Sequence, residues 1–347
     1  MTKNIQLHTI LTFFLLLTPS CSSSKNLTES AENRQNADKI IVAYVTSWTD
    51  VIPETKHITH INYAFGHVDS TFDGVRIDNE ERLKKIVKLR DTKKELKILL
   101  SLGGWRSGGF SEMAADEKCR HLFVADCRRV VDEFGLDGID VDWEFPASGS
   151  AGISSSSEDK DNFTKLIRDL REVLGEEKLV TIASSARKIY FDFPAIIHQL
   201  DFVNLMTYDM GSPPFHHSAL FPSAFTRVSG EESVKMHLKA GVPMEKIVFG
   251  MPFYGRGKSD AMKFLTFKEV KNQNFTEKWD TFAKVPYLIN SKGEIALVYE
   301  NPLSIVYKCN FILEKGLRGA MFWEYAGDDE QGSLRKTIWN ELMNREK

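Results

Sequence analysis

Four carboxylates lie close together in the segment Asp137 to Pro146, which reads DGIDVDWEFP. Side chains of a β-strand alternate between its two faces, so Asp140, Asp142 and Glu144 share one face and the apolar residues between them share the other. Carboxylates this close and shielded from water do not all ionise, because burial and like-charge repulsion both disfavour the charged form. The segment therefore predicts a carboxyl group that keeps its proton near neutral pH, as a general acid requires.

Two other interpretations of this acidic face compete with the general acid. A solvated strand edge is the common reason for acids in a strand, but here the opposite face is Ile, Val and Trp and no Lys or Arg is interleaved. A divalent-cation site is the second, because Asp-x-Asp-x-Glu can chelate a metal. The chain offers no obvious further ligand set and no Cys/His cluster with zinc spacing, so we expect no metal and no cofactor. Asp137 has the opposite parity and is predicted to be structural.

Eight segments read as β-strands, and helical patterns separate most of them. The strands are expected at residues 39–48, 58–68, 96–104, 136–144, 178–186, 201–209, 246–255 and 318–325, and helices at 79–94, 119–135, 158–175 and 230–241. Strands that alternate with helices indicate parallel pairing, and eight such units predict an α/β fold, a (β/α)8 TIM barrel. An open doubly wound sheet is the alternative, but the first strand lacks the Gly-rich turn typical of that fold.

Two connections are longer than a barrel requires. Residues 210–230 follow the sixth strand, and residues 256–301 follow the seventh and contain strand-like pieces of their own. Both leave from the carboxyl ends of strands, where barrel enzymes build their active sites. Elaboration at that face suits a long substrate.

Composition narrows the class of protein. The 347 residues carry a net charge of -3, with a pI near 6.3, so they lack the basic character typical of nucleic-acid binding. Aromatic residues make up 11% of the chain and provide surfaces on which a sugar can stack. We expect a monomer that binds no nucleic acid.

The first 38 residues are predicted to lie outside the fold. A basic residue, a short apolar run and small residues precede Cys21, which is the layout of a secretory signal. We expect residues 1–21 to be a lipoprotein-type signal with Cys21 as the lipidated residue, residues 22–38 a polar tether, and residues 39–347 the catalytic barrel. Membrane contact is expected only through this lipid, at the bacterial cell envelope; plain secretion is the alternative. Cys119 and Cys127 are eight residues apart on a predicted helix, about 12 Å, too far for a disulfide.

The acidic segment resembles the signature of the family 18 glycoside hydrolases, the chitinase family, Asp-Gly-x-Asp-x-Asp-x-Glu on the fourth barrel strand. Other segments resemble further motifs of that family in the same order: SLGG at 101–104, MTYD at 206–209, PFYGR at 252–256 and MFWEY at 321–325. The similarity extends from about residue 40 to 345. The stretch 258–301 is short for the α+β insertion that many members carry after the seventh strand.

The resemblance implies retaining hydrolysis of β-1,4-linked N-acetylglucosamine, in which the 2-acetamido group of the substrate is the nucleophile and an oxazolinium ion is the intermediate. Glu144 is then the acid that protonates the glycosidic oxygen and later activates water. Asp142 orients the acetamide and stabilises the positive charge. Asp140 holds the proton that Asp142 shares, with Ser101 as its hydrogen-bond partner.

The same resemblance assigns the substrate-binding residues. Tyr208 is implied to bind the acetamide carbonyl, Asp209 and Arg256 the sugar, and Trp323 the apolar floor beneath it. Further cleft positions match Tyr44, Phe65, Trp105, Met206 and Tyr254. Two other functions share the motif: an endo-β-N-acetylglucosaminidase acting on N-glycan cores, and a glycan-binding protein without catalysis. The N-acetylglucosamine glycan itself, whether chitin, oligosaccharide, N-glycan or peptidoglycan, is not specified by the sequence.

Overall fold

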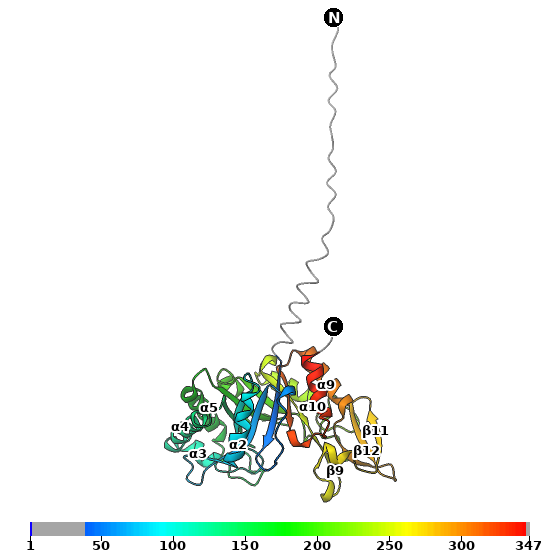
Figure 1. Cartoon of the computed structure of the whole chain (residues 1–347), viewed down its shortest axis with the longest axis horizontal. Helices are drawn as coiled ribbons and strands as arrows, with labels where there is room; N and C mark the ends of the chain where they lie inside the picture. Colours follow the sequence, from blue (N-terminus) through cyan, green and yellow to red (C-terminus); the bar gives the residue numbers. More distant parts are fainter. Residues whose placement is uncertain (2–38, 345–347) are drawn as a thin grey trace. The chain divides into compact units, whose positions relative to one another are not determined.

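Eight parallel strands form a closed barrel in the computed structural model, which describes Met1 and residues 39–344 (Figure 1). The barrel strands are β1 (Ile40–Thr46), β2 (His60–Val68), β4 (Lys97–Gly103), β5 (Gly138–Asp142), β6 (Leu179–Ser185), β7 (Phe202–Met206), β8 (Ile247–Pro252) and β14 (Gly319–Trp323). Each strand pairs with the next, and β1 closes the ring by pairing with both β2 and β14. All eight strands lie inside the predicted segments, and the predicted TIM barrel is confirmed.

Helices connect the strands and surround the barrel. They are α2 (Glu80–Val87), α3 (Phe110–Ala115), α4 (Glu117–Glu133), α5 (Asp159–Leu174), α6 (Phe193–Ile196), α7 (Gly230–Lys239), α9 (Pro302–Lys315) and α10 (Ser333–Met343). Local chemistry fixes their ends: the Ser229 side chain accepts a hydrogen bond from the backbone N–H of Glu232, whose carboxylate accepts one in return. Asn301 caps α9 in the same reciprocal way with Ser304.

Two apolar layers lie on the two sides of the barrel wall. The outer layer, between strands and helices, contains Ile139, Val141 and Trp143, and the Trp143 ring stacks on Phe110 at 5.3 Å. The inner layer is smaller and includes Tyr44 and Met321. The apolar face of β5 thus covers the outside of the barrel, and its acids point inward, as strand parity predicts.

The insertion after β8 is a separate antiparallel sheet with the order β10-β9-β13-β12-β11. Its strands are β9 (Tyr254–Gly257), β10 (Leu265–Thr266), β11 (Thr276–Asp280), β12 (Val285–Ile289) and β13 (Ile295–Val298), and the short helix α8 (Phe267–Val270) follows β10. The sequence indicated only the regions of β10 and β13. The hairpin of β11 and β12 was missed because β11 is mostly exposed, and its sequence TEKWD shows no apolar alternation. A short strand, β3 (Val75–Ile77), also extends β2.

The predicted lipidation site Cys21 and the predicted tether at 22–38 lie outside the described residues. Cys119 and Cys127 are not joined in a disulfide, as expected from their spacing, and Cys127 is buried. In residues 39–344, no helix is both long and apolar enough to cross a membrane.

Candidate active site

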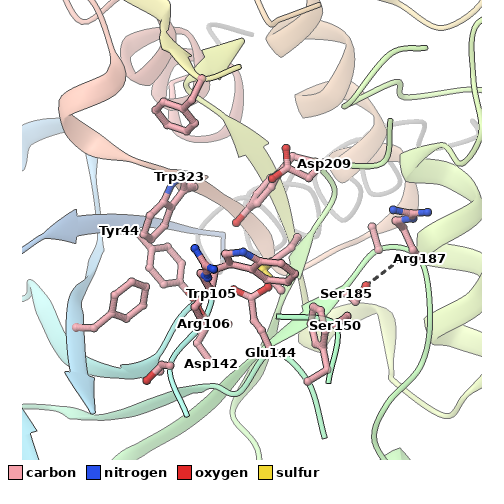
Figure 2. Close-up of a pocket in the computed structure, with 18 of the residues that line it drawn as sticks. Tyr44, Trp105, Arg106, Asp142, Glu144, Ser150, Ser185, Arg187, Asp209 and Trp323 are labelled. Carbon is pink, nitrogen blue, oxygen red and sulfur yellow. Dashed lines mark hydrogen bonds between the residues drawn. The ribbon is translucent and has the colours of Figure 1, made fainter. Parts of the chain in front are cut away.

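A cleft of about 1380 Å³ opens at the carboxyl ends of the barrel strands. Figure 2 shows the side chains of Asp142, Glu144, Trp105 and Trp323 in this cleft, with Trp105 close to Glu144 in the view. Eleven of the predicted site residues line this cleft: Tyr44, Phe65, Trp105, Asp142, Glu144, Met206, Tyr208, Asp209, Tyr254, Arg256 and Trp323. Two others, Ser101 and Asp140, do not reach it.

Asp140 lies below the cleft, fully buried inside the barrel. Its carboxylate accepts four hydrogen bonds from four different strands, donated by Tyr44 (2.8 Å), Ser101 (2.8 Å), Thr181 (2.6 Å) and Asn204 (3.1 Å). Ser101 is therefore a positioning residue for Asp140 and not a substrate-binding one, because it is too deeply buried to touch a substrate. Burial raises the pKa of Asp140, whereas these four hydrogen bonds act in the opposite direction.

Asp142 is the next acid along the strand and is also buried. Its Oδ1 atom has no hydrogen-bond partner among the described residues. Burial, the charge of Glu144 and the charge of Asp140 together hold the pKa of Asp142 well above its usual range. Asp142 thus presents a carboxyl oxygen without a partner among the described residues at the base of the cleft.

Glu144 completes the acidic face where β5 ends and the backbone turns through a cis peptide bond to Phe145. Burial, followed by the charge of Asp209, raises the pKa of Glu144 to about 8. The carboxyl group therefore keeps its proton at neutral pH. No group of three or more His, Cys, Asp or Glu side chains within residues 39–344 is arranged to hold a metal ion.

The glycine pair after Ser101 lets β4 approach β5 closely. Gly103 has φ +121°, and a Cβ atom there would lie 2.2 Å from the carbonyl oxygen of Asp142. The backbone N–H of Gly104 donates to that same oxygen at 2.8 Å. The SLGG segment is thus required for the backbone contact that fixes Asp142.

Aromatic side chains form the opposite part of the cleft. The Trp323 ring stacks on Phe65 at 5.6 Å and lies 5.6 Å from Tyr44. Among the described residues, the hydroxyl of Tyr208 has a single polar contact, a long one of 3.9 Å to the sulfur of Met321. A flat apolar surface and a hydroxyl group therefore face the two upper carboxylates.

Asp209 and Arg256 bind each other across the cleft wall. The guanidinium donates two hydrogen bonds to the carboxylate, at 2.7 and 2.6 Å, and His217 Nδ1 lies 3.6 Å from the same carboxylate. Although burial alone would raise the pKa of Asp209, His217 and Arg256 hold it well below its usual range. Asp209 is thus a permanent negative charge near Glu144.

Several cleft residues were not found from the sequence. Trp48 lies 6.2 Å from Trp323, and Phe264 from the insertion stacks on Tyr254 at 4.4 Å. Arg106 and Arg187 also line the cleft. Two of them could have been suspected from their positions in the sequence. Trp48 is at the carboxyl end of the first predicted strand, and Arg106 directly follows the predicted site residue Trp105. Asp137 is separate from the site: it accepts the backbone N–H of Ile98 at 2.8 Å.

Comparison with known proteins identifies the family. The model of the glycosyl hydrolases family 18 matches residues 40–328. This chain belongs to that family. Chitinase A1 of Niallia circulans is 33% identical over 314 residues, which cover 75% of this chain and 44% of the relative, so the chain spans less than half of that protein. Probable chitinase 2 of Drosophila melanogaster is 27% identical, over 93% of this chain and 79% of the relative.

Solved structures of the family have the same fold. An N-acetylglucosaminidase of glycoside hydrolase family 18 from Paenibacillus barengoltzii has a TM-score of 0.79 and 34% identity, covering 87% of this chain and 99% of its own. A chitinase from Bacillus thuringiensis has a TM-score of 0.79 and 26% identity, covering 88% of this chain and 70% of its own.

Proposed function

We propose that this protein is a retaining glycoside hydrolase that cleaves β-1,4-linked N-acetylglucosamine polymers or oligomers by substrate-assisted catalysis. The observation that carries the proposal is the placement in one cleft of Glu144, whose pKa burial raises to about 8, and Asp142, whose buried Oδ1 has no partner among the described residues. An acetamide N–H of the substrate supplies the missing donor to Asp142. Family membership supports the same chemistry.

Catalysis then proceeds in two steps at the anomeric carbon. Glu144 donates its proton to the glycosidic oxygen while the acetamide oxygen attacks the anomeric carbon, so the bond to the leaving sugar breaks and an oxazolinium ion forms. Glu144, now a carboxylate, accepts a proton from water, which opens the ring with retention of configuration. Asp142 stabilises the cation, and Asp140 is held beneath it by four hydrogen bonds.

The remaining cleft residues hold the reacting sugar. Trp323 offers an apolar surface for the sugar ring, and Tyr208, whose hydroxyl has only the long contact to Met321, binds the acetamide carbonyl. Without substrate, the Asp209 carboxylate and the Arg256 guanidinium bind each other. When substrate is bound, both groups contact its sugar hydroxyls. Tyr44, besides bonding Asp140, closes the base of the cleft.

The first test is a Glu144→Gln variant assayed on a chromogenic chitobioside. Loss of a general acid typically lowers the rate by about 10²–10⁴-fold, so we expect kcat to fall by at least ~100-fold while oligomer binding persists. Glu245→Gln, the same change at an exposed residue, is the control and should keep full activity. Equal rates for wild type and Glu144→Gln would overturn the catalytic assignment.

A second test concerns the substrate. A matched glucoside without the 2-acetamido group should not be turned over, because the nucleophile is missing. The products of a chitin-oligomer series would then show whether this enzyme releases single sugars, as the name of the Paenibacillus barengoltzii N-acetylglucosaminidase denotes for that protein, or longer units. Normal rates on plain glucosides would contradict the mechanism.

A further inference from the structure

Five arginine and lysine side chains line the cleft besides Arg256. Arg76 is paired with Asp78, and four remain: Arg106, Arg187, Lys188 and Lys263. None of the four forms an ion pair with an acidic side chain in the part of the chain that the structure describes. A neutral glycan would leave these charges unused. Their positions therefore bear on the kind of sugar that the cleft accepts.

Three of these cations stand on either side of the catalytic acid. Arg106 belongs to the loop that follows β4, and Arg187 and Lys188 belong to the loop that follows β6. Strand β5, which ends just before Glu144, pairs with β4 on one edge and β6 on the other. In the view of Figure 2, Arg106 and Arg187 lie on opposite sides of Glu144.

The excess of positive charge is local to the cleft. The chain as a whole carries a net charge of -3. The acids that line the cleft are already engaged: Asp142 and Glu144 form the catalytic pair, Asp209 binds Arg256, and Asp78 binds His67 and Arg76. The acids at the cleft surface thus leave these cations to face whatever glycan enters.

Both loops that carry the cations are tied to the rest of the site. Ser107, next to Arg106, hydrogen-bonds His67 on β2 at 2.8 Å. On the other side, Tyr190 stacks on Phe145 with ring centroids 4.5 Å apart, and the Lys188 ammonium lies 4.9 Å from the Tyr190 ring centre. The cations are thus presented from anchored loops, which lowers the entropic cost of using them.

The direction of the cleavage reaction identifies which sugar of the substrate lies next to these cationic side chains. Trp323, the floor for the reacting ring, is on β14, and in the closed ring of strands β14 lies across the barrel from β5. Glu144 protonates the oxygen of the leaving sugar, so that sugar extends past Glu144 toward the loops after β4 and β6. Arg106 belongs to the first of these loops and Arg187 and Lys188 to the second, and all three line the cleft.

We propose that the sugar on the leaving side of the bond carries an anionic group, a carboxylate or a sulfate, that the cations flanking Glu144 bind. The inference rests on the proposed function for the position of the cleaved bond. Guanidinium groups suit both anions, because their paired N–H donors match two oxygens of a carboxylate or sulfate. The substrate class is then an acidic glycan with β-linked N-acetylglucosamine before the cleaved bond.

The test compares matched acidic and neutral ligands. Binding to Glu144→Gln is measured by NMR titration for N-acetylglucosamine β-1,4-linked to N-acetylmuramic acid, and for its methyl ester, which removes only the charge. Chitobiose with and without a 6-O-sulfate on the second sugar forms the sulfate arm. We expect the acid to bind about tenfold more tightly than its ester at low salt, and the advantage to shrink at about 0.5 M NaCl.

Arginine variants locate the effect. In the Glu144→Gln background, Arg106→Gln and Arg187→Gln should each reduce the ratio of acid to ester affinity severalfold, and Arg168→Gln, an exposed arginine on α5, should leave it unchanged. A preference for carboxylate or for sulfate supports the proposal and identifies its anion; equal binding within both pairs overturns it. Wild-type enzyme that prefers the acid yet cleaves neither ligand nor any chitin oligomer would refute the hydrolase function and leave the charge preference standing.

Discussion

The three inward acids of β5 have the same functional group but different surroundings, and the surroundings set their chemistry. Asp140 has four donors and no contact with the cleft, Asp142 keeps one oxygen without a partner among the described residues, and Glu144 is raised in pKa by burial and by Asp209. Burial raises the pKa of all three acids, so their positions separate their roles: Asp142 and Glu144 line the cleft, and Asp140 supports them from below.

The charge of Asp209 should set the alkaline limit of activity. Glu144 donates a proton, so activity falls as the pH rises through its pKa, about 8. Asp209→Asn removes a negative charge that favours the protonated form, and the pKa of Glu144 should therefore fall. We expect the alkaline limb of kcat/KM to move roughly 0.5–1 pH unit toward acid, in a pH profile on a soluble chitobioside.

Asp78→Asn is the matched control for this profile. It removes a carboxylate from the rim of the same cleft, where Asp78 pairs with His67 and Arg76 rather than acting on Glu144. Its alkaline limb should coincide with that of the wild type. An unshifted limb in Asp209→Asn would show that burial alone raises the pKa of Glu144.

At the scale of elements, His216 and Ser218 attach the long loop after β7 to the insertion, and His217 between them contacts Asp209 of the same loop. His216 lies 3.1 Å from Asp280 on β11, His217 approaches Asp209, and Ser218 donates to Glu300. Glu300 follows β13 and is itself paired with the fully buried Lys308 of α9. These contacts join the wall of the cleft to the barrel.

Breaking the buried Glu300–Lys308 pair should destabilise the protein strongly. Glu300→Gln leaves the Lys308 ammonium buried without its counter-charge, facing neutral acceptors such as the carbonyl oxygen of Ser218, which costs about 3–5 kcal/mol of unfolding free energy. The double variant Glu300→Gln/Lys308→Met removes the uncompensated charge and should lose less. Urea denaturation measures both, and a single variant as stable as the wild type would show that the pair contributes little.

The sequence located the barrel strands but not the hairpin of the insertion. Barrel strands are buried on both faces and read as continuous apolar runs, such as KILLSLG in β4. Strand β11 has three exposed residues at its start and little apolar signal. Likewise, Arg187 has no motif around it, and its place in the cleft follows only from the pairing of β5 with β6.

At the scale of the whole molecule, barrel closure creates the site. The four donors to Asp140 come from β1, β4, β6 and β7, which are brought together only when β1 pairs with β14 and β2. The resemblance to the family motifs indicated Ser101 as one hydrogen-bond partner of Asp140. Thr181 and Asn204 were missed because each is a single polar residue between apolar neighbours, in LVTIA and FVNLM, outside any recognised motif.

The predicted signal at residues 1–21 leads to a prediction for the full chain. We propose that residues 1–21 direct export and that Cys21 carries the lipid, with residues 22–38 as the tether. Expression in a bacterium with radiolabelled palmitate should label the wild type and leave Cys21→Ser unlabelled and released from membranes. Because all the site residues belong to residues 39–344, chitobiosidase activity should be equal in the two proteins. Label retained in Cys21→Ser would contradict the assignment.

The raised pKa of Glu144 also has a consequence for the stability of the whole fold. The ordinary value is 4.5 and the folded value about 8, so folding disfavours the charged form. Below pH 4.5 the group is protonated in both states and costs nothing; above about pH 8 the full penalty is present. Stability therefore decreases across this range because of Glu144.

Replacing Glu144 with Gln should remove that penalty. Each pKa unit corresponds to about 1.4 kcal/mol, and a gain of ~1 kcal/mol raises Tm by roughly 1.5–2 °C in a domain of about 300 residues. We expect Glu144→Gln to melt at least a few degrees above the wild type at pH 9 and at the same temperature at pH 4, with Glu245→Gln unchanged at both. An equal gain at both pH values would mean that the substitution acts through packing, and no gain at pH 9 would mean that the folded protein holds the Glu144 charge without cost.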